Sequence, residues 1–191
     1  MSIDIGLGNW MCQRAHRTPA RPALSFEGTT WSYAELQLRI DRLATSLRAH
    51  GVCRGDRVGF LGLNQPAFFE TLFAAARIGA IFVPLNFRLT GAELRYIIND
   101  AGVHTLIVDA PHQPVIDGIR AQLPCRHFGS ADGAAEGWPA MIQAAQDCAP
   151  LPQGEPVDAD DVAIIMYTSG TTGNPKGVVY SHRSTVLHTM A

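Results

Sequence analysis

Lysine is almost absent from this sequence of 191 residues, and so is any concentration of positive charge. Fourteen of the fifteen basic residues are arginine, which leaves Lys176 as the single lysine. No run of basic residues occurs, and the formal net charge is −2. Proteins that bind nucleic acids or anionic membranes through a general electrostatic surface carry a basic patch or run. We therefore expect no nucleic-acid partner.

Cysteine is also scarce, and its spacing fits no common metal site. The four cysteines, Cys12, Cys53, Cys125 and Cys148, are scattered and form no CxxC pair. Zinc and iron–sulfur sites usually show such close pairs. We interpret the cysteines as reduced thiols of a cytoplasmic protein, most of them buried in the core.

Long uninterrupted apolar runs are missing as well. The most apolar region, residues 68–86, contains Glu70, Arg77 and Pro84, whereas a transmembrane helix needs about 20 predominantly apolar residues. The N-terminus has the early Asp4 and no basic residue before an apolar stretch, so it does not resemble a signal peptide. We predict no transmembrane segment and a cytoplasmic location.

Short apolar runs alternate with helical patterns along the chain. Two capping boxes, Ser32 with Glu35 and Thr90 with Glu93, predict the starts of two helices. Strands are predicted at residues 56–63, 80–86, 104–109, 162–168 and 176–181. Further helices are predicted at residues 64–78, 112–123, around 136–147 and from 183 onward. This order favours an α/β fold with a mostly parallel, buried sheet and helices on both of its faces.

The segment YTSGTTGNPKG, residues 167–177, combines the features of a phosphate-binding loop. Three glycines permit positive φ angles and a close approach of backbone amides to an anion: Gly170, Gly173 and Gly177. Hydroxyl donors are supplied by Thr168, Ser169, Thr171 and Thr172. The ammonium group of Lys176 suits a phosphate chain. The alternative interpretation is an ordinary turn between two strands.

The same segment does not fit the Walker A pattern GxxxxGK[ST]. Pro175 stands where that pattern needs glycine, and Gly177 stands where it needs serine or threonine. A phosphate-binding role therefore has to rest on another arrangement of the same groups.

Residues 167–183, YTSGTTGNPKGVVYSHR, resemble the phosphate-loop signature of the acyl-adenylate-forming enzymes. The stretch from WSYAEL through GDRVGFLGL to VPLNFRLT is similar to the N-terminal part of the same enzymes, so the resemblance spans residues 7–191. Within this family, the segments PLNFRL and VVYSHRSTVLHTMA resemble fatty-acyl or aryl-CoA ligases more than peptide-synthetase adenylation domains. The implied fold is an incomplete part of the large N-terminal, AMP-binding domain of an adenylate-forming enzyme, comprising residues 1–191.

The resemblance implies a reaction in two steps. A carboxylic acid, which we expect to be a fatty acid, attacks the α-phosphate of ATP with the help of Mg²⁺ and forms an acyl-adenylate. Coenzyme A then displaces AMP and forms a thioester. Carried over by position, the phosphate-binding residues are Thr168, Ser169, Gly170, Thr171, Thr172, Gly173 and Lys176. The hydroxyl group of Thr168 is also the expected contact to Mg²⁺.

Proteins of this family continue for several hundred residues beyond the loop, through their adenine, carboxylate and coenzyme A sites. We therefore expect an N-terminal fragment that is inactive alone and holds no catalytic residue within 1–191. The alternative is a non-catalytic nucleotide-binding or interaction module. The helix that begins at residue 183 would expose apolar surface at Val186, Leu187 and Met190, and the strand 176–181 would expose an unpaired edge. We therefore also expect a homodimer.

The remaining polar residues have plainer interpretations. His182 is predicted to have a capping or core role. Four histidines share no metal-ligand spacing and are interpreted as solvated or structural: His104, His112, His127 and His188. Asp158, Asp160 and Asp161 are interpreted as an acidic linker before a strand.

Overall fold

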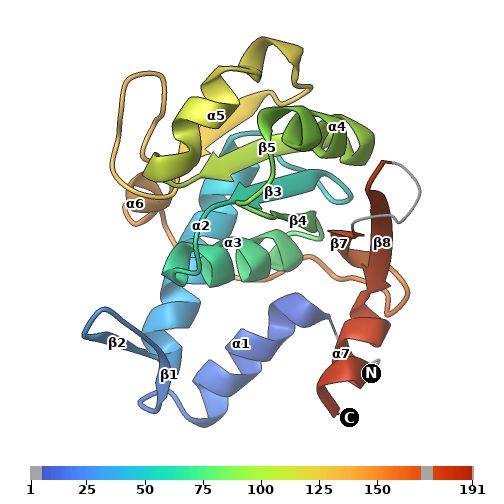
Figure 1. Cartoon of the computed structure of the whole chain (residues 1–191). Coiled ribbons are helices and arrows are strands. Elements are labelled where there is room, and N and C mark those ends of the chain that lie inside the picture. The colour runs from blue at the N-terminus through green and yellow to red at the C-terminus, as the bar shows by residue number, and fades with distance from the viewer. Residues whose placement is uncertain (1–5, 169–173, 191) are drawn as a thin grey trace.

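A six-stranded sheet forms the middle layer of the computed structural model, which describes residues 6–168 and 174–190 (Figure 1). Its strands are β3 (Arg57–Leu61), β4 (Ile81–Leu85), β5 (Val103–Val108), β6 (His127–Ser130), β7 (Val162–Thr168) and β8 (Lys176–Ser181). They lie in the order β6-β5-β3-β4-β7-β8, and all neighbours are parallel except β7 and β8. A separate hairpin consists of β1 (Pro22–Phe26) and β2 (Thr29–Ser32). The predicted α/β fold with a mostly parallel sheet is confirmed.

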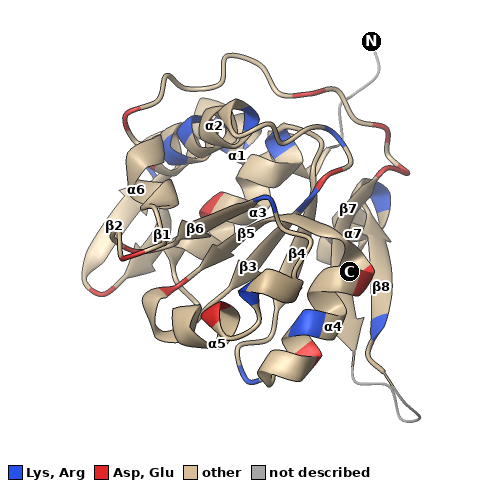
Figure 2. Ribbon diagram, turned by 90° about the horizontal axis from the view of Figure 1, so that it is seen from above, with Lys and Arg blue, Asp and Glu red and all other residues tan. Residues whose placement is uncertain are grey.

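Helices cover both faces of this sheet, which lies between two helical layers when the molecule is seen from above (Figure 2). The α-helices are α1 (Leu7–Arg17), α2 (Tyr33–Ala49), α3 (Pro66–Arg77), α4 (Gly91–Ala101), α5 (Gln113–Asp117), α6 (Met141–Ala145) and α7 (His182–Met190). Helices α2, α3 and α6 enclose the apolar core on one face, and α4 and α5 enclose the core on the other. Helix α1 packs on the outside of α2 and α3.

The central strands contribute side chains to both cores. In β3, Val58 and Phe60 pack into the core beneath α2 and α3, whereas Leu61 packs into the core beneath α4. In β4, Phe82 belongs to the first core and Val83 to the second. Successive side chains of a strand point to opposite faces. Because both faces are covered, the strands consist of continuous apolar runs, and these runs made them predictable.

Both predicted capping boxes are present. The Ser32 hydroxyl accepts a hydrogen bond from the Glu35 amide at 3.3 Å, and the Glu35 carboxylate accepts one from the Ser32 amide at 2.7 Å. Thr90 and Glu93 make the same pair of bonds at the start of α4. These bonds, with the backbone bond first, lower the pKa of both glutamates. The predicted starts of α2 and α4 are thereby confirmed.

Two predicted helices are wrong in extent. The helix predicted at 112–123 is divided into η1 (Ala110–His112), α5 and η2 (Arg120–Gln122). Gly118, a poor helix former, follows α5 directly. The helix around 136–147 shrinks to the five residues of α6, because Gly137 takes a φ of +74° and Pro139 follows it. Neither residue suits the interior of an α-helix.

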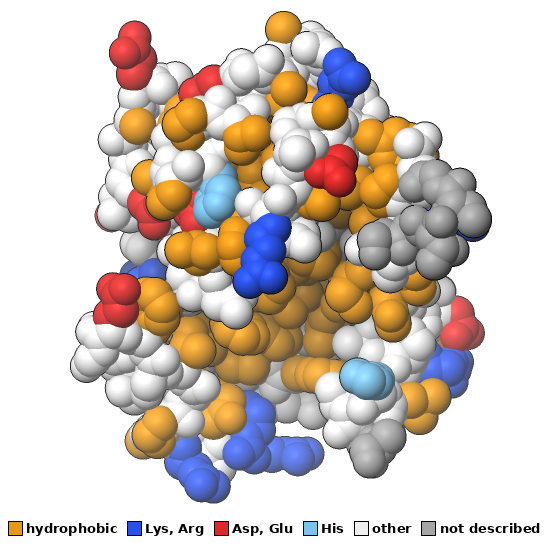
Figure 3. Space-filling model, viewed as in Figure 1, with side chains coloured by type: hydrophobic (Ala, Val, Ile, Leu, Met, Phe, Trp, Pro, Cys, Tyr) orange, Lys and Arg blue, Asp and Glu red, His pale blue; other side chains and the backbone are white. Residues whose placement is uncertain are grey.

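The outer strands are less buried than predicted. In β7 only Ala163 is fully buried among its residues, and Met166 is 39% exposed. In β8, Val178 and Val179 are 38% and 58% exposed. In the described residues β8 is an edge strand, so this end of the sheet lacks the double cover of β3 and β4. Figure 3 shows hydrophobic side chains gathered around a hollow between α3 and the β7–β8 hairpin.

The cysteines also differ from the prediction. Cys53 is exposed, and the other three are only partly buried. Burial nevertheless raises the pKa of the Cys125 thiol to about 12. In the part of the chain that the structure describes, no helix is both long enough and apolar enough to cross a membrane.

Candidate functional site

The predicted phosphate loop joins the two strands of the β7–β8 hairpin. Ser169, Gly170, Thr171, Thr172 and Gly173 lie outside the described residues. At the base of the loop, Thr168 and Lys176 are directly paired across the two antiparallel strands, and both are exposed. Directly opposite residues of an antiparallel pair project from the same face, with Cβ atoms about 5 Å apart. The Thr168 hydroxyl and the Lys176 ammonium therefore leave the hairpin on one side.

The base of the loop lies at the edge of the sheet where the parallel strands end. Helices α3 and α4, which follow the neighbouring strands β3 and β4, pack on opposite faces of the sheet. A ligand crevice is typical of the carboxyl ends of strands at such a switch point. A cleft of about 280 Å³ is present there. Its lining includes Gly62, Asn64, Phe68, Asn86, Phe87 and Met166.

Tyr167 anchors the hairpin one residue before the loop. Its hydroxyl donates a hydrogen bond to Asp100 Oδ2 of α4 at 2.6 Å. Burial, followed by the nearby Asp100 carboxylate, raises the pKa of Tyr167. The hydroxyl therefore stays protonated near neutral pH and remains a donor. Because α4 packs into the core through Leu94, Ile97 and Ile98, this bond attaches the hairpin next to Thr168 to the packed part of the fold.

Gly177 has a role other than the predicted one. It lies in β8 opposite Tyr167 and is not among the glycines with positive φ. A Cβ atom at this position would lie 3.1 Å from Tyr167 Cζ and 3.1 Å from Ile165 Cγ2. The missing side chain makes room for the tyrosine ring, so Gly177 acts through packing. The prediction that it supplies a positive φ angle is wrong.

His182 belongs to the core, as predicted. It is 1% exposed, and its Nδ1 accepts a hydrogen bond from the Leu7 amide at 3.1 Å. The neighbouring Arg183 pairs with Asp160 at 2.8 Å. These two contacts attach the start of α7 to α1 and to the segment before β7.

A buried carboxylate on the far side of the cleft was not found from the sequence. Asp109, which follows β5, is 2% exposed. Its Oδ2 accepts a hydrogen bond from the Leu63 amide at 2.8 Å, and its Oδ1 lies 2.5 Å from His112 Nδ1. The His112 ring lies 5.7 Å from the ring of Phe87, which lines the cleft. Asp109 thus joins the loops after β3 and β5, a contact between residues far apart in sequence.

The described residues contain no group of three or more His, Cys, Asp or Glu side chains placed to hold a metal ion. The acidic segment before β7 forms ion pairs instead, among them Asp161 with Arg54 at 2.5 Å. This agrees with its interpretation as a linker. Three histidines do meet at the sheet edge: His127 lies 5.5 Å from His50 and 5.8 Å from His104, between ring centroids.

Comparison with known proteins finds relatives that match most of this chain. A feruloyl-CoA synthase of Amycolatopsis sp is 41% identical over 181 residues, covering 93% of this chain and 33% of that protein. The long-chain-fatty-acid–CoA ligase FadD13 of Mycobacterium tuberculosis is 38% identical over 181 residues, covering 92% and 35%. The crystal structure of ATP-bound MatB from Rhodopseudomonas palustris has a TM-score of 0.85 at 29% identity, covering 98% and 37%.

These shares mean that the chain spans about a third of the length of the relatives it matches. The match to the family itself extends over residues 12–191, and the family is described as AMP-binding enzyme. The relatives named above include acid–CoA ligases with aromatic and with aliphatic substrates. The chain therefore belongs to the family of AMP-binding enzymes.

Proposed function

We propose that this chain supplies the phosphate loop of an ATP-dependent acid–CoA ligase. The whole enzyme would convert a carboxylic acid to an acyl-adenylate and then transfer the acyl group to coenzyme A. The observation that carries the proposal is the pairing of Thr168 with Lys176 at the base of the loop, beside the cleft at the ends of β3 and β4. By itself, the 191-residue chain is expected to release no pyrophosphate from ATP.

The residues of the hairpin would act by position and charge. Thr168 and Lys176 project toward one side, so an ammonium and a hydroxyl donor can contact the same phosphate chain. Ser169, Gly170, Thr171, Thr172 and Gly173 would add backbone and hydroxyl donors. Charge developing on the phosphates is stabilised best by donors that are already in place. The Tyr167–Asp100 bond would help to hold the neighbouring Thr168 in place.

Mg²⁺ would neutralise part of the phosphate charge. In the described residues its candidate contact is the exposed hydroxyl of Thr168, and no group of three or more His, Cys, Asp or Glu side chains is placed there to hold the ion. A hydroxyl beside a phosphate chain fits Mg²⁺, which usually keeps several waters and is bound through substrate phosphates.

The acid substrate is proposed to have an apolar body. Phe68, Leu89 and Met166 line the cleft next to the hairpin, and such a surface favours an aliphatic or aromatic group. A fatty acid is our first candidate. Relatives with an aromatic acid in their names, such as feruloyl-CoA synthase, make aromatic acids the second.

The test compares variants of the full-length ligase that contains this chain. Lys176→Ala is expected to lower kcat/KM for adenylation. The decrease should correspond to a loss of about 2–4 kcal/mol of transition-state stabilisation, the cost of losing one preorganised donor. Arg17→Ala removes an exposed cation from α1 and serves as the matched control. Pyrophosphate release with a panel of fatty and aromatic acids measures both. Full activity of the Lys176 variant would contradict the proposed role.

Thr168 offers a second matched pair. Thr168→Val keeps the shape of the side chain and removes its hydroxyl, whereas Thr168→Ser keeps the hydroxyl. We expect the valine variant to need more Mg²⁺ for half-maximal rate and the serine variant to resemble the wild type. Equal Mg²⁺ dependence of the two variants would count against Thr168 as a metal contact.

The alternative of a non-catalytic nucleotide-binding module makes a different prediction. In that case the protein would bind ATP, with an affinity reduced by Lys176→Ala, but would form no acyl-adenylate with any acid of the panel.

A further inference from the structure

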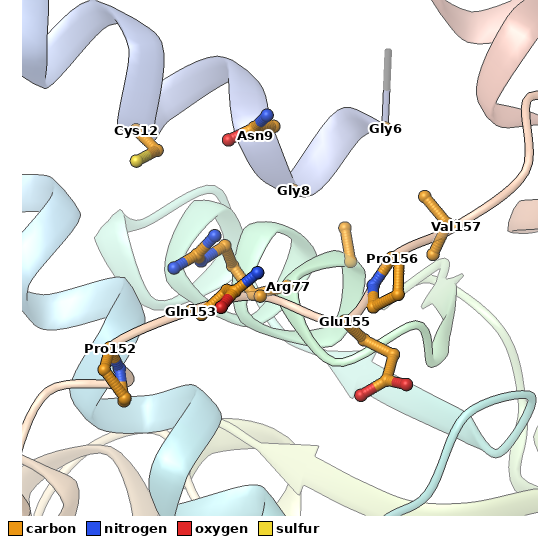
Figure 4. A pocket seen from close by; sticks show the side chains of 12 residues that line it. Gly6, Gly8, Asn9, Cys12, Arg77, Pro152, Gln153, Glu155, Pro156 and Val157 are labelled. Atoms are coloured by element: carbon orange, nitrogen blue, oxygen red, sulfur yellow. The ribbon is translucent and has the colours of Figure 1, made fainter. Parts of the chain in front are cut away.

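A second cavity, of about 420 Å³, lies between α1, the end of α3 and residues 152–157 (Figure 4). Its lining includes Gly8 and Cys12 of α1, Arg77 of α3 and Gln153. The segment 152–157 belongs to the connection between α6 and β7. The lining is thus separate from the hairpin and from the cleft beside it.

Arg77 is a buried cation in the wall of this cavity. The residue is 7% exposed, and its Nε donates a hydrogen bond to Asp41 Oδ1 at 2.9 Å. The other oxygen of Asp41 accepts a hydrogen bond from Gln37 Nε2 at 2.8 Å. Among the described residues, no hydrogen bond uses Nη1 or Nη2 of Arg77. A guanidinium has five N–H donors. Nη1 and Nη2 are not among the buried atoms that lack a partner, so they are accessible to a ligand from the cavity.

The guanidinium faces the cavity. Figure 4 shows the Arg77 side chain extending into the space between α1 and the 152–157 segment. The Cys12 side chain points into the same space from α1. The unused donors of Arg77 and the Cys12 thiol therefore lie on facing walls.

The walls approach closely because two of the lining residues are glycines. A Cβ atom on Gly8 would lie 2.6 Å from the Ala76 carbonyl carbon, and one on Gly154 would lie 2.6 Å from Arg77 Nη1. The Glu155 amide also donates a hydrogen bond to the Arg77 carbonyl at 2.8 Å. The segment 152–157 is thus fixed directly against Arg77, and the cavity is a defined feature of the fold.

The charged side chains around the cavity are arranged so that they do not repel an anion. Glu155 lines it, but its carboxylate accepts a hydrogen bond from Arg48 at 2.7 Å and points away from α1 in Figure 4. Helix α1 begins at the cavity without an acidic residue in its first turn, and its Leu7 amide donates a hydrogen bond to His182 Nδ1. This turn therefore brings no negative side chain to the cavity.

We propose that this cavity binds a small oxyanion, a carboxylate or a phosphate group, through Nη1 and Nη2 of Arg77. The planar guanidinium presents two parallel N–H donors that match two oxygens of such a group. The volume admits a phosphate or a short carboxylic acid. Because Asp41 already offsets the charge of Arg77, we expect binding in the millimolar range.

Cys12 provides a direct measure of occupancy. The rate of its alkylation by iodoacetamide is followed by mass spectrometry, with the exposed Cys53 as an internal reference outside the cavity lining. Sodium phosphate and sodium acetate are titrated separately against chloride at constant ionic strength. At about three times the dissociation constant, mass action predicts a roughly fourfold slowing at Cys12 if the occupied site excludes the reagent. The rate at Cys53 should not change.

Two variants link the protection to Arg77. Arg77→Gln removes the paired donors, and Gly154→Ala places a methyl group 2.6 Å from Nη1, which must then shift. Both should abolish the protection, while Arg88→Gln, which removes an exposed cation outside the cavity lining, should keep it. Protection by phosphate alone or by acetate alone identifies the preferred oxyanion.

The proposal is overturned if neither anion protects Cys12, or if Cys53 is protected equally. It is also overturned if protection persists in Arg77→Gln. Should that variant fail to fold, unchanged protection in Gly154→Ala overturns it, and loss of protection there supports it.

Discussion

Replacing Gly177 by alanine separates two reasons for a glycine at the end of the phosphate loop. If the residue serves packing, the added methyl group would lie 3.1 Å from Cζ of Tyr167, closer than an ordinary contact, and the ring would have to shift. If it served only a phosphate, the protein without nucleotide would tolerate alanine. The stability of the free protein therefore distinguishes the two.

The expected loss of stability follows from three contributions. Forcing the Tyr167 ring aside costs about 1–3 kcal/mol as overpacking, and loss of its hydrogen bond to Asp100 costs about 0.5–1.5 kcal/mol. Alanine recovers about 0.5–1 kcal/mol of the conformational entropy that glycine loses in a strand. Because the tyrosine is only partly buried, we expect a net destabilisation of about 1–2 kcal/mol.

Urea unfolding of the wild type, Gly177→Ala, Tyr167→Phe and the double variant measures this loss. Tyr167→Phe removes only the hydroxyl and should cost about 1 kcal/mol. The double variant should be less destabilised than the sum of the single variants, because both act on the same hydrogen bond. A Gly177→Ala protein as stable as the wild type, or strictly additive single variants, would refute the packing argument.

Two further predictions concern the surface. Burial, and next the positive charge of His50, His104 and Arg126, lowers the pKa of His127 from its ordinary 6.5. Between the pKa of His127 in the folded protein and 6.5, the unfolded chain binds more protons, so the free energy of unfolding should fall as the pH is lowered through this window. In His127→Asn it should fall less steeply. The same pH dependence of urea unfolding in both proteins would contradict this prediction. Val179 and Leu187 are 58% and 59% exposed, so light scattering at micromolar concentration should show a homodimer that Val179→Lys weakens. A monodisperse monomer of the wild type would exclude this.

Local signals in the sequence predicted the central part of the fold. Capping boxes at Ser32 and Thr90 located α2 and α4, because a cap depends on residues three positions apart. Helix α1, in contrast, begins at Gly6 without a side-chain cap. Strand β6 is four residues long and contains Gly129, so it has no apolar run to detect. These elements are fixed by tertiary packing, which a single sequence does not reveal.

For the candidate site, the sequence indicated the two strands but none of the tertiary contacts around them. The pairing of the two strands places Thr168 beside Lys176, and the sequence already indicated both strands. The supports of the site came only from the structure. Tyr167 bonds to Asp100, 67 residues away, and Asp109 bonds to Leu63, 46 residues away. No local pattern marks such partners, because their contact depends on the order of the strands.

The bond between the Leu7 amide and His182, which spans 175 residues, bears on the order of folding. Strands β3, β4 and β5 lie between residues 57 and 108 and pair through short crossovers. Strand β7 reaches β4 only after the chain between β5 and β7 has been ordered, and contacts of such sequence separation form late. During synthesis on the ribosome, β4 would therefore remain an unpaired edge strand of the sheet until β7 emerges. Among the described strands of the sheet, β7 and β8 would therefore be the last to join.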